Sequence, residues 1–350
     1  MARTLVAMTS ALPRELRLST SSTLRDAALA PATLLAYNKQ LLAFLHHTRL
    51  SLSQLKRKRS SRIDRRLSSY IDYLFEHDGS YDYACQAMFG LIYRLPSLRL
   101  KLGESRLRLK GWRRLKHSRS HPPITWELCV VFAIKMAQWG YHAHAVATLL
   151  SFDCYLRVGE LTRLQYSDVV WPGDPRTGSA HPTMALRLGI TKTGRNQWVS
   201  LGNQQVATVL QHYLRAFPFM TDDLIFPFSP QSFRDLLRQV SVALGVGDIP
   251  YVPHSFRHGG ATCDFLRGRS ITDIMFRGRW AALESATRYI QTARALLILQ
   301  RIPSRLNQYG LALSPHLADT MQLLLEAVPC IGMAIAGVRR LRRHIPSLWV

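Results

Sequence analysis

The chain has 350 residues, 47% of them hydrophobic, and its 46 lysines and arginines against 22 aspartates and glutamates give a formal net charge of +24. This length allows two domains with a buried core each, and positive charge spread along the whole chain favours a nucleic acid partner over a membrane surface, which would need the charge on one amphipathic helix. The five cysteines are far apart, show no metal-ligand spacing and argue against a disulfide framework, so we expect an intracellular protein, nuclear if the source is eukaryotic.

The first third of the chain has the pattern of a helical domain. Residues 1–30 lack the long apolar centre of a secretory signal and are expected to be loose. From Pro31 onward apolar residues recur at helical spacing, which predicts helices over residues 31–48, 61–78 and 81–95. This periodicity indicates a small helical bundle, which we assign to residues 31–117.

Two segments of this third are strongly basic. The run from Lys56 to Arg59 is either a phosphate-contacting or nuclear-import patch or a solvated loop, and the pattern leaves both interpretations open. The segment LRLKLGESRLRLKGWRRLKHSRSHPP is either a solvated basic helix or an element that lies along phosphates. We favour the second interpretation, because clustered cations repel one another unless a polyanion neutralises them. The domain boundary is expected at residues 117–122.

The remainder predicts a second domain, residues 122–310, that is helical apart from one hairpin. The segment MALRLGITKTGRNQWVSLG alternates apolar and polar residues around a turn at residues 191–195, which predicts two antiparallel strands. Helices are expected over residues 125–139, 142–155, 203–216 and 231–243. The predicted fold class is mainly α with a small antiparallel sheet, an α+β fold.

The last segment, residues 311–350, is an apolar and basic tail. Its stretch MQLLLEAVPCIGMAIAGV contains Glu326 and Pro329, and it is too short and too interrupted for a membrane span. We expect no membrane association. An apolar tail of this kind would suit docking onto a neighbouring protomer.

An ordered set of side chains suits chemistry on a phosphate. His254 and Arg257 are three residues apart, so they share one face of a helix. Tyr289 is expected in a short helix further on, and upstream an apolar helix is expected to end in Arg157. In chain order the candidate site residues are Arg157, Lys192, His254, Arg257, Trp280 and Tyr289.

This order resembles the tyrosine recombinase family, the phage-integrase type of enzymes that break and rejoin DNA, over about residues 122–300. The resemblance implies an N-terminal helical core-binding domain that clamps DNA and an integrase-type catalytic domain. It implies cleavage through a 3′-phosphotyrosine intermediate, double-stranded DNA as partner, four protomers on two DNA sites, and neither a metal, a nucleotide cofactor nor a small-molecule substrate. The GRW…RYI form and the GWRRL segment look like those of eukaryotic retroelement or Crypton-type recombinases of mobile elements.

Chemistry explains the roles that the resemblance implies. The guanidinium forks of Arg157 and Arg257 suit the negative charge that builds on the non-bridging phosphate oxygens during cleavage. A phenol is a weak nucleophile, so His254 is the expected base for the Tyr289 hydroxyl. Lys192, near the hairpin turn, is the expected acid for the departing 5′ oxygen.

Three further side chains are expected to support these residues. The Trp280 indole, at a position where many relatives have histidine, can donate one hydrogen bond to the phosphate while its ring packs against the core. Glu160 is expected to buttress the segment that carries Arg157. His258 is expected to pack beside its neighbours and to orient them.

Two other hypotheses fit the same residues. A type IB topoisomerase would use this set to relax supercoils as a monomer, and relaxation without strand exchange by the purified monomer would favour it. A catalytically silent DNA-binding protein descended from a recombinase is the second, and the intact set of six residues argues against it.

Overall fold

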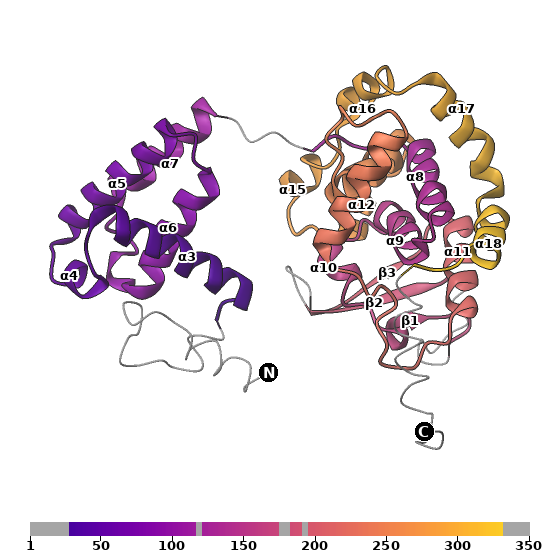
Figure 1. Cartoon of the computed structure of the whole chain (residues 1–350), viewed down its shortest axis with the longest axis horizontal. Coiled ribbons are helices and arrows are strands. Elements are labelled where there is room, and N and C mark those ends of the chain that lie inside the picture. The colour runs from indigo at the N-terminus through magenta and orange to yellow at the C-terminus, as the bar shows by residue number, and fades with distance from the viewer. Residues whose placement is uncertain (1–27, 117–120, 175–182, 191–194, 332–350) are drawn as a thin grey trace, which may run out of the picture. The chain divides into compact units, whose positions relative to one another are not determined.

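The computed structural model describes residues 28–116, 121–174, 183–190 and 195–331. The chain divides into two compact units, residues 1–119 and 120–350 (Figure 1). Within the described ranges the regular elements are helices apart from one three-stranded antiparallel sheet in the second unit, so the predicted α+β class is confirmed.

The first unit is a helical bundle (Figure 1). Its elements are α3 (Pro31–Thr48), α4 (Leu52–Lys56), α5 (Ser60–Glu76), α6 (Tyr81–Arg94), the 3-10 turn η2 (Pro96–Leu98) and α7 (Gly103–Leu115). The helices predicted between residues 31 and 95 correspond to α3, α5 and α6. The bundle is held by side chains without exposed surface, among them Leu41, Phe44, Leu67 and Leu91.

Helix α7 lies within the basic segment that was expected in solvent or along phosphates. Leu109 and Trp112 on one side of it are buried in the bundle core, while most of its arginines and lysines are exposed. The carboxylate of Asp64 in α5 accepts the backbone N–H groups of Glu104 and Ser105, at 2.9 Å each, and so satisfies donors at the start of α7. The segment is therefore an integral helix of the first unit, because its apolar residues recur at helical spacing between the cations.

The second unit contains the predicted helices and several further ones. Its helices are α8 (Trp126–Gln138), α9 (His142–Asp153), α10 (Val158–Leu161), α11 (Gln204–Ala216), α12 (Pro230–Ala243), α13 (Pro253–Leu266), α14 (Ile271–Gly278), α15 (Leu283–Thr287), α16 (Thr292–Leu299), α17 (Ser304–Leu313) and α18 (Leu317–Ala327). The expected helices at residues 125–139, 142–155, 203–216 and 231–243 correspond to α8, α9, α11 and α12.

The sheet has the order β1–β2–β3, with β1 (Val169–Val170), β2 (Ala185–Ile190) and β3 (Arg195–Ser200). The strands β2 and β3 are the predicted antiparallel hairpin, with Leu186 opposite Val199. Both of these side chains are buried, which fits the alternation seen in the sequence.

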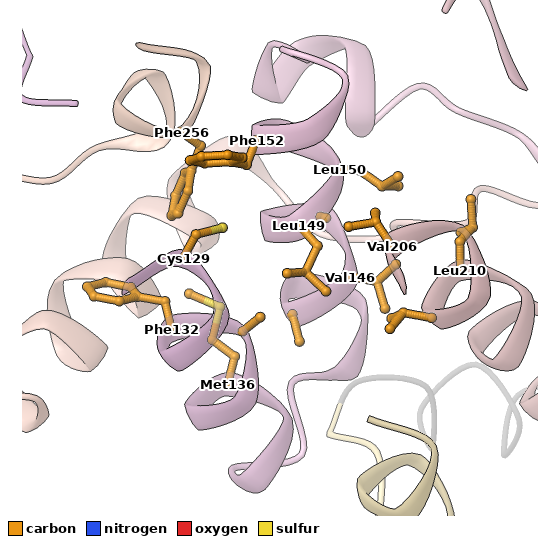
Figure 2. Close-up of a cluster of buried hydrophobic side chains, with 14 of the residues drawn as sticks. Cys129, Phe132, Met136, Val146, Leu149, Leu150, Phe152, Val206, Leu210 and Phe256 are labelled. Atoms are coloured by element: carbon orange, nitrogen blue, oxygen red, sulfur yellow. The ribbon is translucent and has the colours of Figure 1, made fainter. Parts of the chain in front are cut away.

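Helices α8 and α9 lie in the middle of the second unit, with the sheet at one end of it (Figure 1). Both helices are apolar on nearly every side, as expected for helices surrounded by other elements. Figure 2 shows where they meet α11 and α13, through the labelled side chains of Cys129, Phe132, Met136, Val146, Leu149, Leu150, Phe152, Val206, Leu210 and Phe256.

The segment from residue 311 onward, which was expected to be a tail, packs in its first part against its own unit. Leu317 and Met321 of α18 have no exposed surface, and Leu325 follows them on the same helical stripe. The Gln205 side chain accepts the N–H of Ala318, at 2.9 Å, and ties α18 to α11. Residues 317–327 therefore complete the core, whereas residues 332–350 lie outside the described part. No helix in the described ranges is long and apolar enough to cross a membrane.

Candidate active site

Helix α13 carries two of the predicted residues and packs closely against the end of α9. A Cβ atom at Gly259 would lie 2.1 Å from the carbonyl oxygen of Ile124, and one at Gly260 would lie 2.0 Å from that of Phe152. Both distances are far below a van der Waals contact, so only glycine fits at these positions. The close approach lets Arg257 reach the backbone where α9 ends.

Arg257 has no exposed surface. Its guanidinium group donates to the carbonyl oxygens of Tyr155 and Gly278, the second at 2.6 Å. Burial, together with the positive charges of Arg157 and Arg279, lowers the pKa of Arg257 below its ordinary value. The group remains cationic at neutral pH, so a positive charge lies buried at the centre of the site.

Arg157 lies beyond a left-handed turn, and the prediction that the apolar helix ends in Arg157 is wrong. Helix α9 ends at Asp153, whose carbonyl oxygen accepts hydrogen bonds from Arg277, and Tyr155 then adopts a φ of 50°. Arg157 is the residue before α10, and its Nη1 lies 2.7 Å from Oε1 of Glu160. The backbone N–H of Arg157 donates to Oε2 of the same carboxylate at 2.9 Å, so Glu160 buttresses Arg157 as expected.

Tyr289 lies in a turn directly after α15, and the prediction that it belongs to a short helix is wrong. Its carbonyl oxygen accepts the Thr262 hydroxyl of α13, at 3.2 Å, and this bond to a neighbouring helix ends the local helical pattern. The phenol ring stacks against Trp280 and against His258, with a ring-centre distance of 4.6 Å to each. The Arg257 guanidinium carbon lies 5.1 Å from the centre of the same ring.

Two histidines face Tyr289 as neutral imidazoles. The ring centres of His254 and Tyr289 are 6.4 Å apart. Burial, followed by the charge of Arg257, lowers the pKa of His254 to about 4, and burial likewise lowers the pKa of His258 to about 4. At neutral pH the imidazole of His254 is therefore uncharged.

The site holds buried hydrogen-bond donors without acceptors. Among the described residues, no partner is found for Nε of Arg257, Nε of Arg279 or Nε1 of Trp280. Buried polar groups in proteins are nearly always paired, and an unpaired one is costly. Three unpaired donors, two of them on cations, fit an anionic ligand such as a phosphate.

Five of the six predicted residues come together in one cluster. Arg257, Trp280, His254 and Tyr289 are joined by the ring and guanidinium contacts given above, and Arg157 is joined to them through Glu160 and Arg279. Lys192 lies outside the described residues. Within the described ranges there is no group of three or more His, Cys, Asp or Glu side chains placed to hold a metal ion.

Sequence reasoning missed two residues at the site. Arg279 is buried and lies 3.0 Å from Glu160. It directly follows α14 in the left-handed conformation that usually requires glycine, and an arginine at such a helix end was its signal in the sequence. His121 lies beside His254, with ring centres 6.2 Å apart, but its sequence context is a basic segment that gives no such signal.

No family model matches the sequence, and no curated protein matches it. The structure is similar to that of the Tn1549 transposon integrase in complex with circular intermediate DNA, with a TM-score of 0.56 and 14% identity, covering 77% of this chain and 94% of that one. A variant of that integrase in complex with transposon right end DNA gives a TM-score of 0.52 and 16% identity, over 77% and 93%. The XerA recombinase gives 0.38 and 17%, over 86% and 97%. The expected resemblance is thus confirmed at the level of the fold, and the chain has the tyrosine recombinase fold.

Proposed function

We propose that the chain is a tyrosine recombinase that cuts a DNA strand with Tyr289 and rejoins it to another strand. The observation that carries the proposal is the meeting of Arg157, Arg257 and Trp280 with Tyr289 around buried donors that lack acceptors. The charge of +24 supports DNA as the ligand. The Tn1549 integrase, which shares the fold, was captured with DNA.

The proposed step is an exchange of one phosphate ester for another. The Tyr289 hydroxyl oxygen attacks the scissile phosphorus, its proton passes to the neutral imidazole of His254, and the bond from phosphorus to the 5′ oxygen breaks. The departing 5′ oxygen takes a proton from Lys192. The guanidinium groups and the Trp280 indole donate to the non-bridging oxygens, where charge accumulates. Attack by another 5′ hydroxyl reverses the step and releases Tyr289.

The scheme needs neither a metal nor a nucleotide, because the energy of the broken bond is kept in the phosphotyrosine. We extend it to four protomers on two double-stranded DNA sites, since exchange requires two cut duplexes held together. A chain of this kind would serve a mobile element, and in a eukaryotic host it would act in the nucleus.

The test is covalent capture on DNA. The full chain is incubated with nicked duplex fragments of the genome that encodes it, in the presence of a chelator, and protein-linked strands are isolated under denaturing conditions and sequenced. The proposal expects adducts at defined positions, joined through the 3′ phosphate, and exchange between two captured sites. Adducts with relaxation of supercoils but no exchange would indicate a topoisomerase, and salt-sensitive binding without adducts would indicate a silent DNA-binding protein.

A further inference from the structure

Arg279 occupies a backbone conformation that arginine rarely adopts. It follows the last residue of α14 and has a φ of 56°, in the left-handed region where glycine is preferred. A non-glycine residue in this region costs about 1 kcal/mol or more and persists only where its surroundings hold it there. The side chain is also buried, with 9% of the residue exposed. The position therefore keeps a guanidinium group in the interior at a cost in backbone energy.

The contacts of Arg279 join it to both predicted arginines. Its Nη2 lies 3.0 Å from Oε2 of Glu160, the carboxylate that also pairs with Arg157. The same Nη2 donates to the carbonyl oxygen of Tyr155, at 3.3 Å, and Arg257 donates to that oxygen as well. One carboxylate and one carbonyl oxygen thus tie three guanidinium groups into a single cluster.

The charges of this cluster are unequal. It holds three guanidinium groups and one carboxylate, that of Glu160, which has 5% of its surface exposed and pairs with Arg157 and Arg279. Burial alone would raise the pKa of Glu160, but the charge of Arg279, together with the charge and hydrogen bonds of Arg157, brings it below its ordinary value. Glu160 is therefore ionised. Without Arg279, its charge would face Arg157 alone as a close pair, and Arg157 would have less charge to offer an anion.

We propose that Arg279 is a positioning residue of the phosphate site, which occupies one oxygen of Glu160 and so holds Arg157 in place while leaving the cluster a net positive charge. The inference rests on the proposed function. Arg279 acts through Glu160 and Arg157, and it is absent from the set of six residues that the sequence pattern picks out.

A purely structural role is the competing explanation, because Arg279 also donates to the carbonyl oxygens of Arg277 and Cys154, at 3.2 and 3.4 Å. Such bonds would hold the end of α14 whatever the charge of the ligand. The two explanations differ in their dependence on that charge. A substrate with a neutral phosphate has no use for a positive cluster, but it needs a correctly folded site as much as any other substrate does.

The experiment compares Arg279→Gln with wild type on two substrates in single-turnover adduct assays. One substrate is the nicked duplex mapped with wild-type adducts, and the other carries an uncharged methylphosphonate at the cleaved position. We expect Arg279→Gln to slow adduct formation about 10- to 100-fold on the phosphate and much less on the methylphosphonate. Arg279→Lys, which keeps the charge, should recover part of the rate. In a Glu160→Gln background the Arg279→Gln effect should shrink, because the two residues act together.

Thermal unfolding of each variant controls for stability. Tyr213→Phe serves as the matched control, because it removes a buried hydrogen bond to the carbonyl oxygen of Ile225, at 2.7 Å, without contacting the site. It should lower the unfolding temperature and leave the adduct rate per folded molecule unchanged. An Arg279→Gln rate equal to that of wild type, or a loss of equal size on both substrates, would overturn the inference. Absence of adducts with wild type would overturn the proposed function and this inference with it.

Discussion

The phenol ring of Tyr289 lies over the guanidinium group of Arg257, whose central carbon is 5.1 Å from the ring centre. A cation above an aromatic face is attracted by the negative charge of that face. Arg257 has no exposed surface in this arrangement. The Trp280 ring, whose centre is 4.6 Å from the same carbon, covers the cation as well, so both aromatic side chains of the predicted site lie against Arg257.

Arg257→Lys tests whether the shape of this cation matters as well as its charge. A single ammonium group is too compact to donate to the carbonyl oxygens of both Tyr155 and Gly278, as the guanidinium fork does. The carbonyl oxygen left unpaired should reduce the free energy of unfolding by about 1–3 kcal/mol. Loss of the planar fork should slow adduct formation about 100-fold or more. Urea unfolding and single-turnover capture measure the two effects. A lysine variant as fast as wild type would show that charge alone suffices.

Gly260→Ala tests the close packing that brings α13 to α9. Its new Cβ atom would lie 2.0 Å from the Phe152 carbonyl oxygen, so one helix must shift, and we expect a loss of about 2 kcal/mol or more in the free energy of unfolding. The control is Gly189→Ala in β2, where a Cβ atom would meet nothing within 4 Å. Equal stability of the two variants in urea would contradict the packing described here.

Buried histidines predict a loss of stability in acid. The pKa values of His144, His254 and His258 are each lowered to about 4, chiefly by burial. The unfolded chain binds protons at these positions below about pH 6.5, whereas the folded chain binds them only near pH 4, so unfolding takes up protons in between. The free energy of unfolding should thus have its full value above about pH 6.5 and decrease as the pH falls toward 4.

His144→Phe isolates one of these groups, because a phenyl ring can keep the stacking on Phe228, whose ring centre is 4.1 Å away. The variant should flatten part of the pH dependence between 6.5 and 4, since it removes one of the histidines whose pKa is lowered by burial. Urea unfolding at several pH values measures the slope. An unchanged slope would mean that His144 is not protonated on unfolding.

Long periodic elements were readable from the sequence, and so was the class of the fold. Helices α3, α8 and α12 have apolar stripes or faces that no tertiary context overrides, and the β2–β3 hairpin has a clear alternation. Helix α7 was harder to place, because its high charge concealed the stripe that Trp112 completes.

The details of the site depended on tertiary structure. Arg157 and Tyr289 were expected in or at the ends of helices, but bonds from Arg277 and Thr262 on other elements set the local turns. The role of Arg279 depends on the carboxylate of Glu160, more than one hundred residues earlier in the chain. Such partners are invisible to local periodicity.

Lys192→Ala tests the proposed proton donor by changing the leaving group. On an ordinary strand the variant should cut about 100- to 10,000-fold more slowly, because the 5′ oxygen needs a proton to depart. A substrate in which sulfur replaces that bridging 5′ oxygen should restore most of the rate, since a thiolate leaves without protonation. Gel-based capture on both substrates measures the ratio. A defect of the same size on both would assign Lys192 another task.

The most direct test of the account asks which atom of the protein becomes joined to DNA. Wild type and Tyr289→Phe are incubated with the nicked substrate, and the adducts are digested and mapped by mass spectrometry, with salt-dependent DNA binding measured in parallel. The account predicts a wild-type adduct on the peptide that contains Tyr289, and a phenylalanine variant that binds DNA normally but forms no adduct. Adducts of equal yield with Tyr289→Phe, or a wild-type adduct on a different residue, would contradict it.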